Sequence, residues 1–333
     1  MNIYCIRPKG FNIGNDIIFL AMRQFLSDEV NIITLPATSK YNGDRAGLTS
    51  KTIHEINQFG DGVIVGGGNL YENNELDVDI DALNKLEVPL FLYSLSRGRV
   101  YNKKGELVNR TDVMPDKKIK ALNSMASFSS ARDRATGEYL GKYTIISACP
   151  SLFIDKIEFT NESPSYILIS VRNPSLMNIP VSKQNEVAET IKGLLRKFKD
   201  AKILCHDWRD ISFAESIEAE YVYTENVYEF LSLLKNCKLN ISFRLHSTLP
   251  CLSYGVPIIN ISYDERASSL IETIGFKRWD INLMEISKLL LQIEIRQNNF
   301  SELDIIKKET RPRWEDFYKI NRKLFQSFTK EIT

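Results

Sequence analysis

Arg244 and His246 combine a permanent cation with an acid–base group, and both follow an apolar strand pattern. Segment 240–262 is predicted as a strand, a short helix and a second strand. An extended backbone points side chains two residues apart in the same direction. The two groups and the helix N-terminus would then meet at one strand end, where open α/β sheets bind ligands and where an anion is favoured. The competing interpretation is a structural unit with a surface arginine and a hydrogen-bonded histidine.

The ends of this helix are also marked in the sequence. Ser247 or Thr248 is predicted to cap its N-terminus, with Pro250 tolerated in the first turn. Gly255 suits a left-handed C-terminal position, and Pro257 prevents the helix from continuing.

Three other strand ends carry candidate residues. Arg172 follows an apolar strand, and its guanidinium can hold a carboxylate or phosphate through two hydrogen bonds. Arg132 either reaches an anion or serves a structural pair with Asp133, which can cap the next helix; we favour the structural role. His206 and Asp207 end a further strand and either line a cleft or act indirectly.

Two loops in the first half are rich in glycine and asparagine. Segment 66–69 places three glycines and an asparagine after a buried strand, and segment 12–16 opens the first helix. Glycine lets a backbone approach a ligand closely, but a tight turn is an equal alternative. The sequence matches neither the GxGxxG nor the GxxxxGK[ST] phosphate-binding pattern. The DxD-like segment 77–81 falls at a helix start, which favours a helix-terminal role over a metal.

Composition is that of a globular protein of 333 residues, with 43% hydrophobic and 26% charged residues. The net charge of +1 and the lack of a basic–aromatic run argue against nucleic acid as a partner. No stretch is long and apolar enough for a membrane span or a signal peptide. Five scattered cysteines and three histidines predict buried free thiols, no metal site and a cytoplasmic protein.

Strand and helix patterns alternate along the chain, which predicts an α/β fold with parallel sheets. We expect two doubly wound Rossmann-like domains that face a cleft, formed by residues 1–155 and 165–310. A linker would lie at 155–165, and a polar excursion at 97–118 would lie at the rim of the first sheet. Residues 311–333 are expected to form a helix that packs back on the domains. Its apolar stripe, which includes Trp314 and Phe325, favours interdomain packing over a membrane anchor.

These motifs together resemble the polysaccharide pyruvyl transferase family over residues 10–275. The resemblance rests on five segments in the family's order, which are 12–16, 61–68, 130–133, 170–172 and 244–247. They are followed by Gly255-Val-Pro257-Ile and by Tyr263-Asp264-Glu265-Arg266, which is close to the family's tyrosine-aspartate-x-basic stretch.

The resemblance implies a glycosyltransferase-B-like fold and transfer of the enolpyruvyl unit of phosphoenolpyruvate to a sugar as a ketal, with release of phosphate. Arg172 and Arg244 would bind the donor, helped by Ser247 and Thr248, and His246 would be the general acid or base, with Arg244 beside it. No metal or other cofactor is required. The acceptor would lie across the cleft, against the residues of the first domain that form these segments: Asn12, Asn15, Asp16, Gly67, Gly68, Asn69 and Arg132.

Two other functions stay open at this point. One is a glycosyltransferase with a nucleotide-sugar donor, for which Asp264 or Glu265 would bind the ribose. The other is a non-catalytic glycan-binding relative. The sequence also leaves open whether the acceptor is lipid-linked, whether the protein attaches peripherally to the inner face of a membrane, and whether it forms a homo-oligomer.

Overall fold

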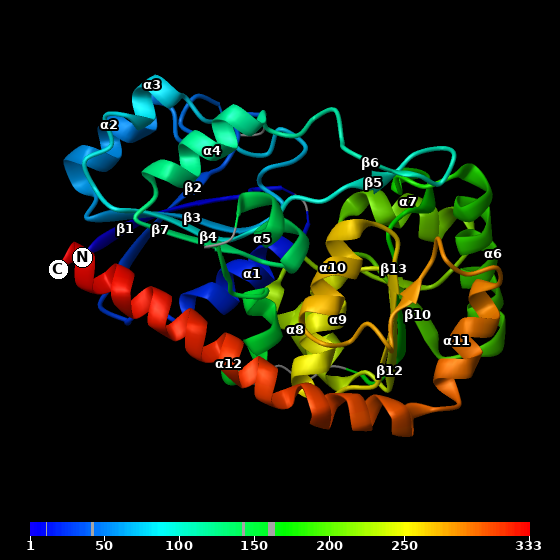
Figure 1. Cartoon of the computed structure of the whole chain (residues 1–333). Coiled ribbons are helices and arrows are strands. Elements are labelled where there is room, and N and C mark those ends of the chain that lie inside the picture. The colour runs from blue at the N-terminus through cyan, green and yellow to red at the C-terminus, as the bar shows by residue number, and fades with distance from the viewer. Residues whose placement is uncertain (11, 41–42, 142–143, 159–163) are drawn as a thin grey trace.

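Two six-stranded parallel sheets, one from each half of the chain, lie side by side (Figure 1). The computed structural model describes all residues except 11, 41–42, 142–143 and 159–163. The first sheet contains β1 (Asn2–Arg7), β2 (Asn31–Pro36), β3 (Gly62–Gly68), β4 (Leu90–Leu95), β7 (Phe128–Ala131) and β8 (Ile145–Ile146). The second contains β9 (Ile167–Ser170), β10 (Ala201–Leu204), β11 (Tyr221–Val222), β12 (Leu239–Ser242), β13 (Ile258–Ser262) and β14 (Ile281–Asn282).

The order of the strands fixes where each sheet can bind a ligand. The first sheet runs β2-β1-β3-β4-β7-β8 and the second runs β11-β10-β9-β12-β13-β14. The winding direction therefore reverses between β1 and β3 in the first sheet and between β9 and β12 in the second. Ligands of open α/β sheets bind at such reversals, beyond the carboxyl ends of the strands.

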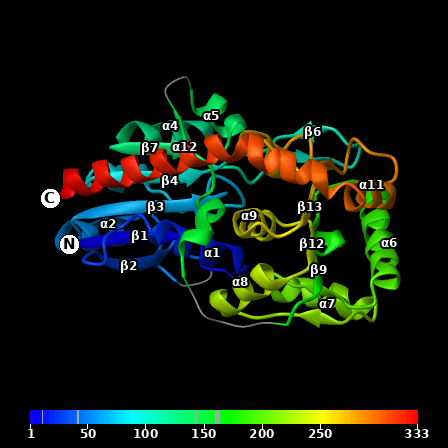
Figure 2. The same cartoon turned by 90° about the horizontal axis from the view of Figure 1, so that it is seen from below.

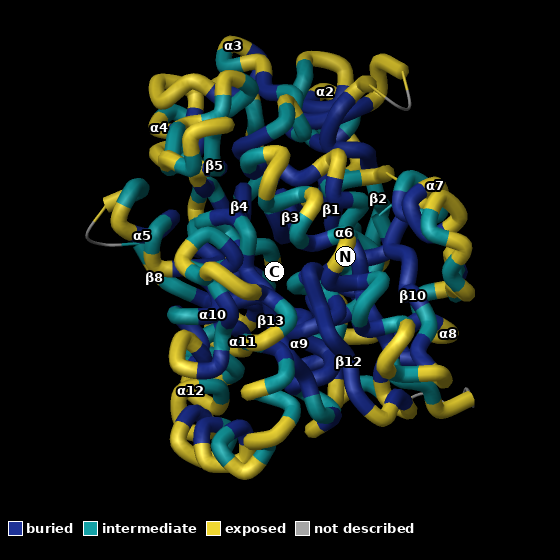
Figure 3. Tube along the Cα trace, turned by 90° about the vertical axis from the view of Figure 1, so that its right-hand side faces the viewer, coloured by how far each residue is buried: buried dark blue, intermediate teal, exposed yellow. Residues whose placement is uncertain are grey.

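Helices cover both sheets, so that the strands are buried and the outer helix faces are exposed (Figure 3). Around the first sheet lie α1 (Gly14–Arg23), α2 (Ser50–Phe59), α3 (Ile80–Leu83), α4 (Asp116–Met125) and α5 (Arg134–Leu140). Around the second lie α6 (Val181–Lys197), α7 (Trp208–Ser216), α8 (Val227–Asn236), α9 (Leu245–Tyr254), α10 (Glu265–Thr273) and α11 (Leu289–Gln297). The predicted pair of doubly wound domains is confirmed.

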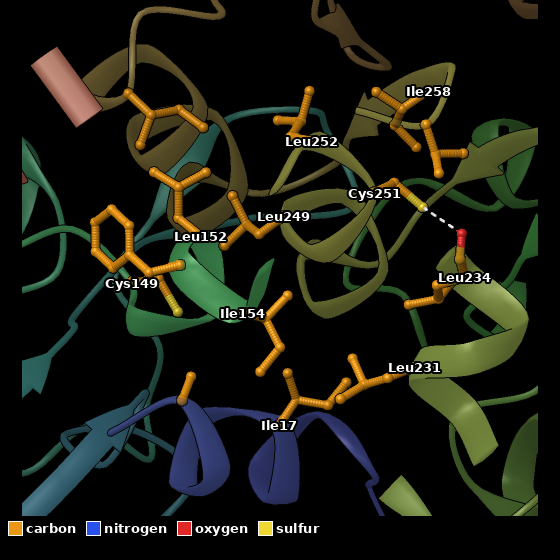
Figure 4. Packing of buried hydrophobic residues seen from close by; sticks show 14 of the residues in the cluster. Ile17, Cys149, Leu152, Ile154, Leu231, Leu234, Leu249, Cys251, Leu252 and Ile258 are labelled. Carbon is orange, nitrogen blue, oxygen red and sulfur yellow. Dashed lines mark hydrogen bonds between the residues drawn. The ribbon is translucent and has the colours of Figure 1, made fainter. Parts of the chain in front are cut away.

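One of the hydrophobic clusters contains residues of both domains. Ile17 of α1 packs with Leu231 of α8, Leu249 of α9 and Ile154 of the 3₁₀ helix η1 (Pro150–Lys156), and all four side chains are buried (Figure 4). The backbone N–H of Ile13, at the start of α1, also donates to the carbonyl of His206 in the other domain at 3.1 Å. The interface is thus an apolar contact that holds α1 against the second sheet.

The C-terminal helix α12 (Phe300–Ile332) lies across both domains and ends near the N-terminus (Figure 2). The indole N–H of Trp314 donates to Ile274 of the second domain at 2.9 Å. The amide of Asn321 donates to Ser147 of the first domain at 2.7 Å, and Phe325 packs on Phe91. The predicted interdomain role is confirmed, but the helix begins at Phe300, earlier than the sequence pattern indicated.

We expected the excursion at 97–118 to lie at the rim of the first sheet, but it extends beyond that rim. It carries a hairpin of β5 (Val100–Tyr101) and β6 (Leu107–Val108) that lies over the second domain (Figure 1). Arg99 pairs with Glu265 through Nε–Oε1 at 3.0 Å. Gly98 lies against Arg266, where a Cβ would stand 2.4 Å from Cγ. The excursion therefore ties the domains together.

The structure differs from several local predictions. Helix α9 begins at Leu245 with Arg244 as its N-cap, so Ser247 and Thr248 do not cap it and Pro250 falls beyond the first turn. Strand β12 ends at Ser242, so Arg244 and His246 do not share one extended strand. Segment 12–16 opens α1 as expected, with Ile13 at the N-cap position and no capping hydrogen bond from its side chain.

Other local predictions are confirmed. Gly255 ends α9 in the left-handed conformation, with φ 76°. Asp79 and Asp133 cap α3 and α5, as their favoured structural roles required. All five cysteines are buried and free. The linker residues 159–163 lie outside the described part. None of the described helices has the length and apolarity that crossing a bilayer requires.

Candidate active site

The reversals of the two sheets face each other across an open cavity of about 710 Å³. The loops after β1 and β3 contribute Asn12 and Asn69 from the first domain, and the first turn of α1 contributes Asn15. The loops after β9 and β12 contribute Arg172 and Arg244 from the second. His246 and Arg132 also line the cavity, among other residues. The fold therefore brings most of the predicted site residues together in one interdomain cleft.

Arg244 is held in place by groups of its own domain. Its Nε donates to the carbonyl of Val171 at 2.7 Å, and its Nη2 donates to the carboxylate of Asp210. Asp210 in turn accepts from the backbone N–H groups of Asn173 at 2.9 Å and His206 at 3.2 Å. One edge of the guanidinium is thus committed to structure, which fixes the direction in which the cation faces the cavity.

Asp207 is a buried carboxylate that lies close to three arginines. Its oxygens lie 2.8 Å from Arg209, 3.3 Å from Arg172 and 3.7 Å from Arg244. Burial alone would raise the pKa of Asp207, but hydrogen bonds from Arg209 and the charges of the other arginines hold it below its usual value. Burial and the neighbouring charge of Arg244 lower the pKa of Arg172. The three arginines therefore carry more positive charge than Asp207 and Asp210 together neutralise.

His246 lies in the first turn of α9, where backbone N–H groups lack intrahelical partners. Its Nε2 is buried and has no hydrogen-bond partner among the described residues. Burial, followed by the charges of Arg132 and Arg244, lowers the pKa of His246 to about 3. The imidazole is therefore neutral near pH 7 in the unliganded protein, and a bound anion would make protonation easier.

This geometry can bind a small anion between two domains and place a titratable imidazole beside it. The model of one protein family, described as polysaccharide pyruvyl transferase, matches residues 12–265. The chain belongs to the polysaccharide pyruvyl transferase family. Membership implies a pyruvyl transferase that acts on a polysaccharide substrate. No curated protein sequence matches the chain.

Solved structures with a similar fold are glycosyltransferase-B-like. The UDP-GlcNAc 2-epimerase of Neisseria meningitidis bound to UDP-GlcNAc has a TM-score of 0.56 and 10% identity, over 98% of this chain and 100% of that one. A putative UDP-N-acetylglucosamine 2-epimerase from Listeria monocytogenes has a TM-score of 0.56 and 13% identity, over 92% of this chain and 90% of that one. MnaA of S. aureus, solved with UDP, has a TM-score of 0.55 and 12% identity, over 92% of this chain and 89% of that one. At these identities the likeness concerns the fold alone.

The predicted hydroxyl ligands of this pyruvyl transferase family member face inward. Ser247 lies 2.6 Å from Ser170 and accepts from the amide of Asn240 at 2.6 Å. Thr248 donates to Asn260 at 2.6 Å. Both side chains are fully buried, so they fasten α9 to its sheet. The part of α9 that faces the cavity is its first turn.

The loops of the first domain divide into lining and supporting residues. Asn12, Asn15 and Asn69 line the cavity, and Asn12 also accepts from the N–H of Gly14 at 3.0 Å. Asp16 instead pairs with Arg7 at 2.8 Å.

The glycines that end β3 shape a turn. Gly67 and Gly68 have φ of 63° and 89°, and a Cβ on Gly67 would stand 2.2 Å from Ile18. They are needed for the turn and for the close approach of α1. They support the site without lining the cavity.

Sequence reasoning missed the two acidic residues that orient the arginines, Asp210 and, in this role, Asp207. It gave Arg266 only as part of a family motif, and not as a residue that lines the cavity and pairs with Glu72 of the other domain at 3.1 Å. The spacing of Asp207 and Asp210 on one helical turn was the available signal. Which arginines they meet depends on the pairing of β9 with β10 and β12, which spacing does not reveal.

Proposed function

We propose that this protein transfers the enolpyruvyl unit of phosphoenolpyruvate to two hydroxyls of a sugar, forming a pyruvate ketal and releasing phosphate. The observation that carries the proposal is the juxtaposition of Arg172, Arg244 and His246 at the strand reversal of the second sheet. Phosphoenolpyruvate carries a carboxylate and a phosphate on one small frame. Two guanidiniums and the first turn of a helix are complementary to that charge.

In this proposal Asp207 and Asp210 act before the substrate arrives. They hold Arg172 and Arg244 in fixed directions, so the donor meets cations that need little reorganisation. The negative donor then offsets the positive field around His246. Its pKa rises from about 3, and the imidazole takes up a proton as the donor binds.

The protonated imidazole can deliver its proton to the methylene carbon of the donor, using the π electrons of the enol. The adjacent carbon becomes oxocarbenium-like, and a sugar hydroxyl attacks it while its own proton returns to the imidazole. The bond from that carbon to the phosphate oxygen then breaks, and phosphate leaves with the bonding electrons. A second hydroxyl attacks the same carbon and gives its proton to the departing phosphate, which closes the ketal. Asn12, Asn15 and Asn69 would bind the sugar across the cleft.

A nucleotide-sugar transferase is the alternative, and it shares the fold of proteins solved with UDP or UDP-GlcNAc. The carboxylates that would serve the ribose already have other partners. Asp264 accepts from the N–H of Ala267 at 2.9 Å and pairs with Arg266, while Glu265 pairs with Arg99. Because both carboxylates already have partners, phosphoenolpyruvate is favoured as the donor over a nucleotide sugar. A non-catalytic glycan-binding relative would not need the oriented arginines.

Thermal-shift titration tests the proposal directly. A ligand that binds only the folded state raises the melting temperature. We expect a shift with phosphoenolpyruvate and none with UDP or UDP-GlcNAc. Arg172→Gln should weaken donor binding by about 2–5 kcal/mol. It is a cleaner variant than one at Arg244, which also holds Val171 and Asp210. A shift with a nucleotide alone would make the protein a nucleotide-sugar enzyme, and protection by neither would favour the non-catalytic relative.

A further inference from the structure

Three side chains that line the cavity contain a buried nitrogen without a hydrogen-bond partner among the described residues. They are Arg132 at Nε, His206 at Nε2 and His246 at Nε2. A buried donor without a partner costs free energy, so such atoms mark places where a ligand or water is expected. Arg132 is the one that carries a permanent charge, and it comes from the first domain.

Arg132 differs from the other arginines of the cavity in its surroundings. Arg172, Arg209, Arg244 and Arg266 each have a carboxylate oxygen within 3.3 Å of a guanidinium nitrogen. The Nε of Arg132 lies 3.9 Å from the nearer carboxylate oxygen of Asp133, beyond hydrogen-bond distance. The side chain is only 3% exposed. A guanidinium at this depth lacks both bulk water and a close counter-ion at this nitrogen.

Asp133 is held in place through its other oxygen, and the Oδ2 that lies nearer to Arg132 is itself buried without a hydrogen-bond partner among the described residues. Its Oδ1 accepts from the N–H of Thr136 at 3.0 Å, where it caps α5, and from the hydroxyl of Ser269 at 3.1 Å. The N–H of Arg132 donates to Leu95 at 2.9 Å, so the backbone is fixed as well. The backbone of Arg132 is thus fixed at the wall of the cavity, while its Nε makes no hydrogen bond within the described part of the chain.

His246 connects Arg132 to the donor side of the cleft. Arg132, Arg244 and His246 line the same cavity, and the charges of both arginines act on this imidazole. An anion near the first turn of α9 can therefore be reached from both domains. The dianionic phosphate of the donor is better suited to this place than its carboxylate, because two cations and the helix N-terminus meet there.

We infer that Arg132 binds the phosphate of the donor, so that the donor is gripped by both domains and not by the second domain alone. This inference rests on the proposed function and moves Arg132 from the acceptor side to the donor side. The same contact would stabilise the negative charge that develops on phosphate oxygen as the bond to carbon breaks. Arg172 is then left for the carboxylate.

The test uses inorganic phosphate and phosphoenolpyruvate as separate probes in thermal-shift titrations of the whole chain. Wild-type protein should be protected by both. Arg132→Gln should lose protection by phosphate and bind phosphoenolpyruvate about 10- to 100-fold more weakly. Arg132→Lys, which keeps the charge, should retain part of both effects. Arg110→Gln is the matched control, because Arg110 lines the same cavity but is paired with Asp112 at 2.8 Å. Its affinity for phosphate should match that of the wild type.

The outcomes separate this inference from the proposed function. If phosphoenolpyruvate protects wild type and Arg132→Gln equally, the inference fails and the proposed function stands. If phosphate protects through Arg132 while phosphoenolpyruvate adds nothing beyond phosphate, the anion site stands and the donor is wrong. Failure of phosphate to protect the wild type overturns the inference.

A spectroscopic measurement covers the case in which Arg132→Gln does not fold. The ¹H–¹⁵N signal of Arg132 Nε, assigned by comparison with Arg132→Lys, should shift when phosphate is added to wild-type protein. An unchanged signal would place the anion elsewhere.

Discussion

The imidazole of His246 lies directly against the backbone of Gly14. A Cβ added to Gly14 would stand 2.5 Å from Nδ1 and 2.9 Å from Cβ of the histidine, closer than atoms can approach. The two residues belong to different domains, and each lies in the first turn of its helix, α1 or α9. The lack of a side chain at Gly14 therefore leaves the space that the imidazole of His246 occupies.

Gly14→Ala should therefore impair the reaction through His246. The added methyl group must push the imidazole aside, and a displacement of about 1 Å can lower turnover about 100-fold. Steady-state kinetics with phosphoenolpyruvate should show a fall in kcat that exceeds any change in donor affinity. Gly193→Ala is the control: its Cβ would meet only Leu290 at 3.6 Å, an ordinary contact. Normal turnover in Gly14→Ala would show that the ring position is not critical.

Donor binding should be coupled to proton uptake by His246. The pKa of this residue is lowered to about 3 in the unliganded protein, so the ring is neutral at pH 7. An anion among the arginines raises that pKa, and a proton enters with the donor. Calorimetry at pH 7 in buffers of different ionisation enthalpy measures this uptake.

The comparison that isolates the histidine is between wild type and His246→Gln. The variant should fold normally, bind the donor with less proton uptake and lose transfer activity. Equal uptake in the two proteins would assign the proton to the phosphate of the donor itself.

How much of this site was predictable depends on the distance over which each contact acts. Arg172, Arg244 and His246 were found because each follows an apolar strand closely, and strand ends of parallel sheets meet at one edge. The caps at Asp79 and Asp133 were equally local. Such features depend on neighbours in the chain, which the sequence displays.

The missed features depend on partners that are remote in the sequence. The hydroxyl of Ser247 binds Ser170 and Asn240 on adjacent strands, and this tertiary network prevails over the capping role that its residue type suggested. The contact of Gly14 with His246 likewise joins two domains. The polar composition of residues 97–118 indicated a surface excursion, but not that its hairpin reaches the second domain.

Asp280 should make stability fall as the pH rises. This carboxyl lies just before β14 and beside β13, where burial raises its pKa from 3.8 to about 6 despite hydrogen bonds from Asn260 at 2.6 Å and Ser262 at 3.0 Å. The folded protein then binds the proton more tightly than the unfolded chain does. The stabilising effect is present below about pH 4 and is lost as the pH passes 6, at a cost of up to about 3 kcal/mol.

Asp280→Asn removes this titration while its amide oxygen can still accept a hydrogen bond. Urea unfolding at pH 5 and pH 8 should show a smaller loss of stability for the variant than for wild type. Asp28→Asn, at an exposed position, should follow the wild type. If Asp280→Asn shows the same pH dependence as wild type, another group is responsible.

The buried ion pair of Glu72 with Arg266 should be the strongest polar link between the domains. Glu72 is fully buried, lies 3.1 Å from Arg266 and also accepts from the N–H of Gly98 in the interdomain excursion. Glu72→Ala would remove a partner of the largely buried Arg266 and release the excursion, so the free energy of unfolding should fall by about 3–5 kcal/mol. Glu189→Ala breaks the exposed pair with Lys192 and should leave the melting temperature unchanged. Equal melting temperatures for the two variants would mean that Asp264 alone satisfies Arg266 and that the apolar core of α1, α8 and α9 holds the cleft together.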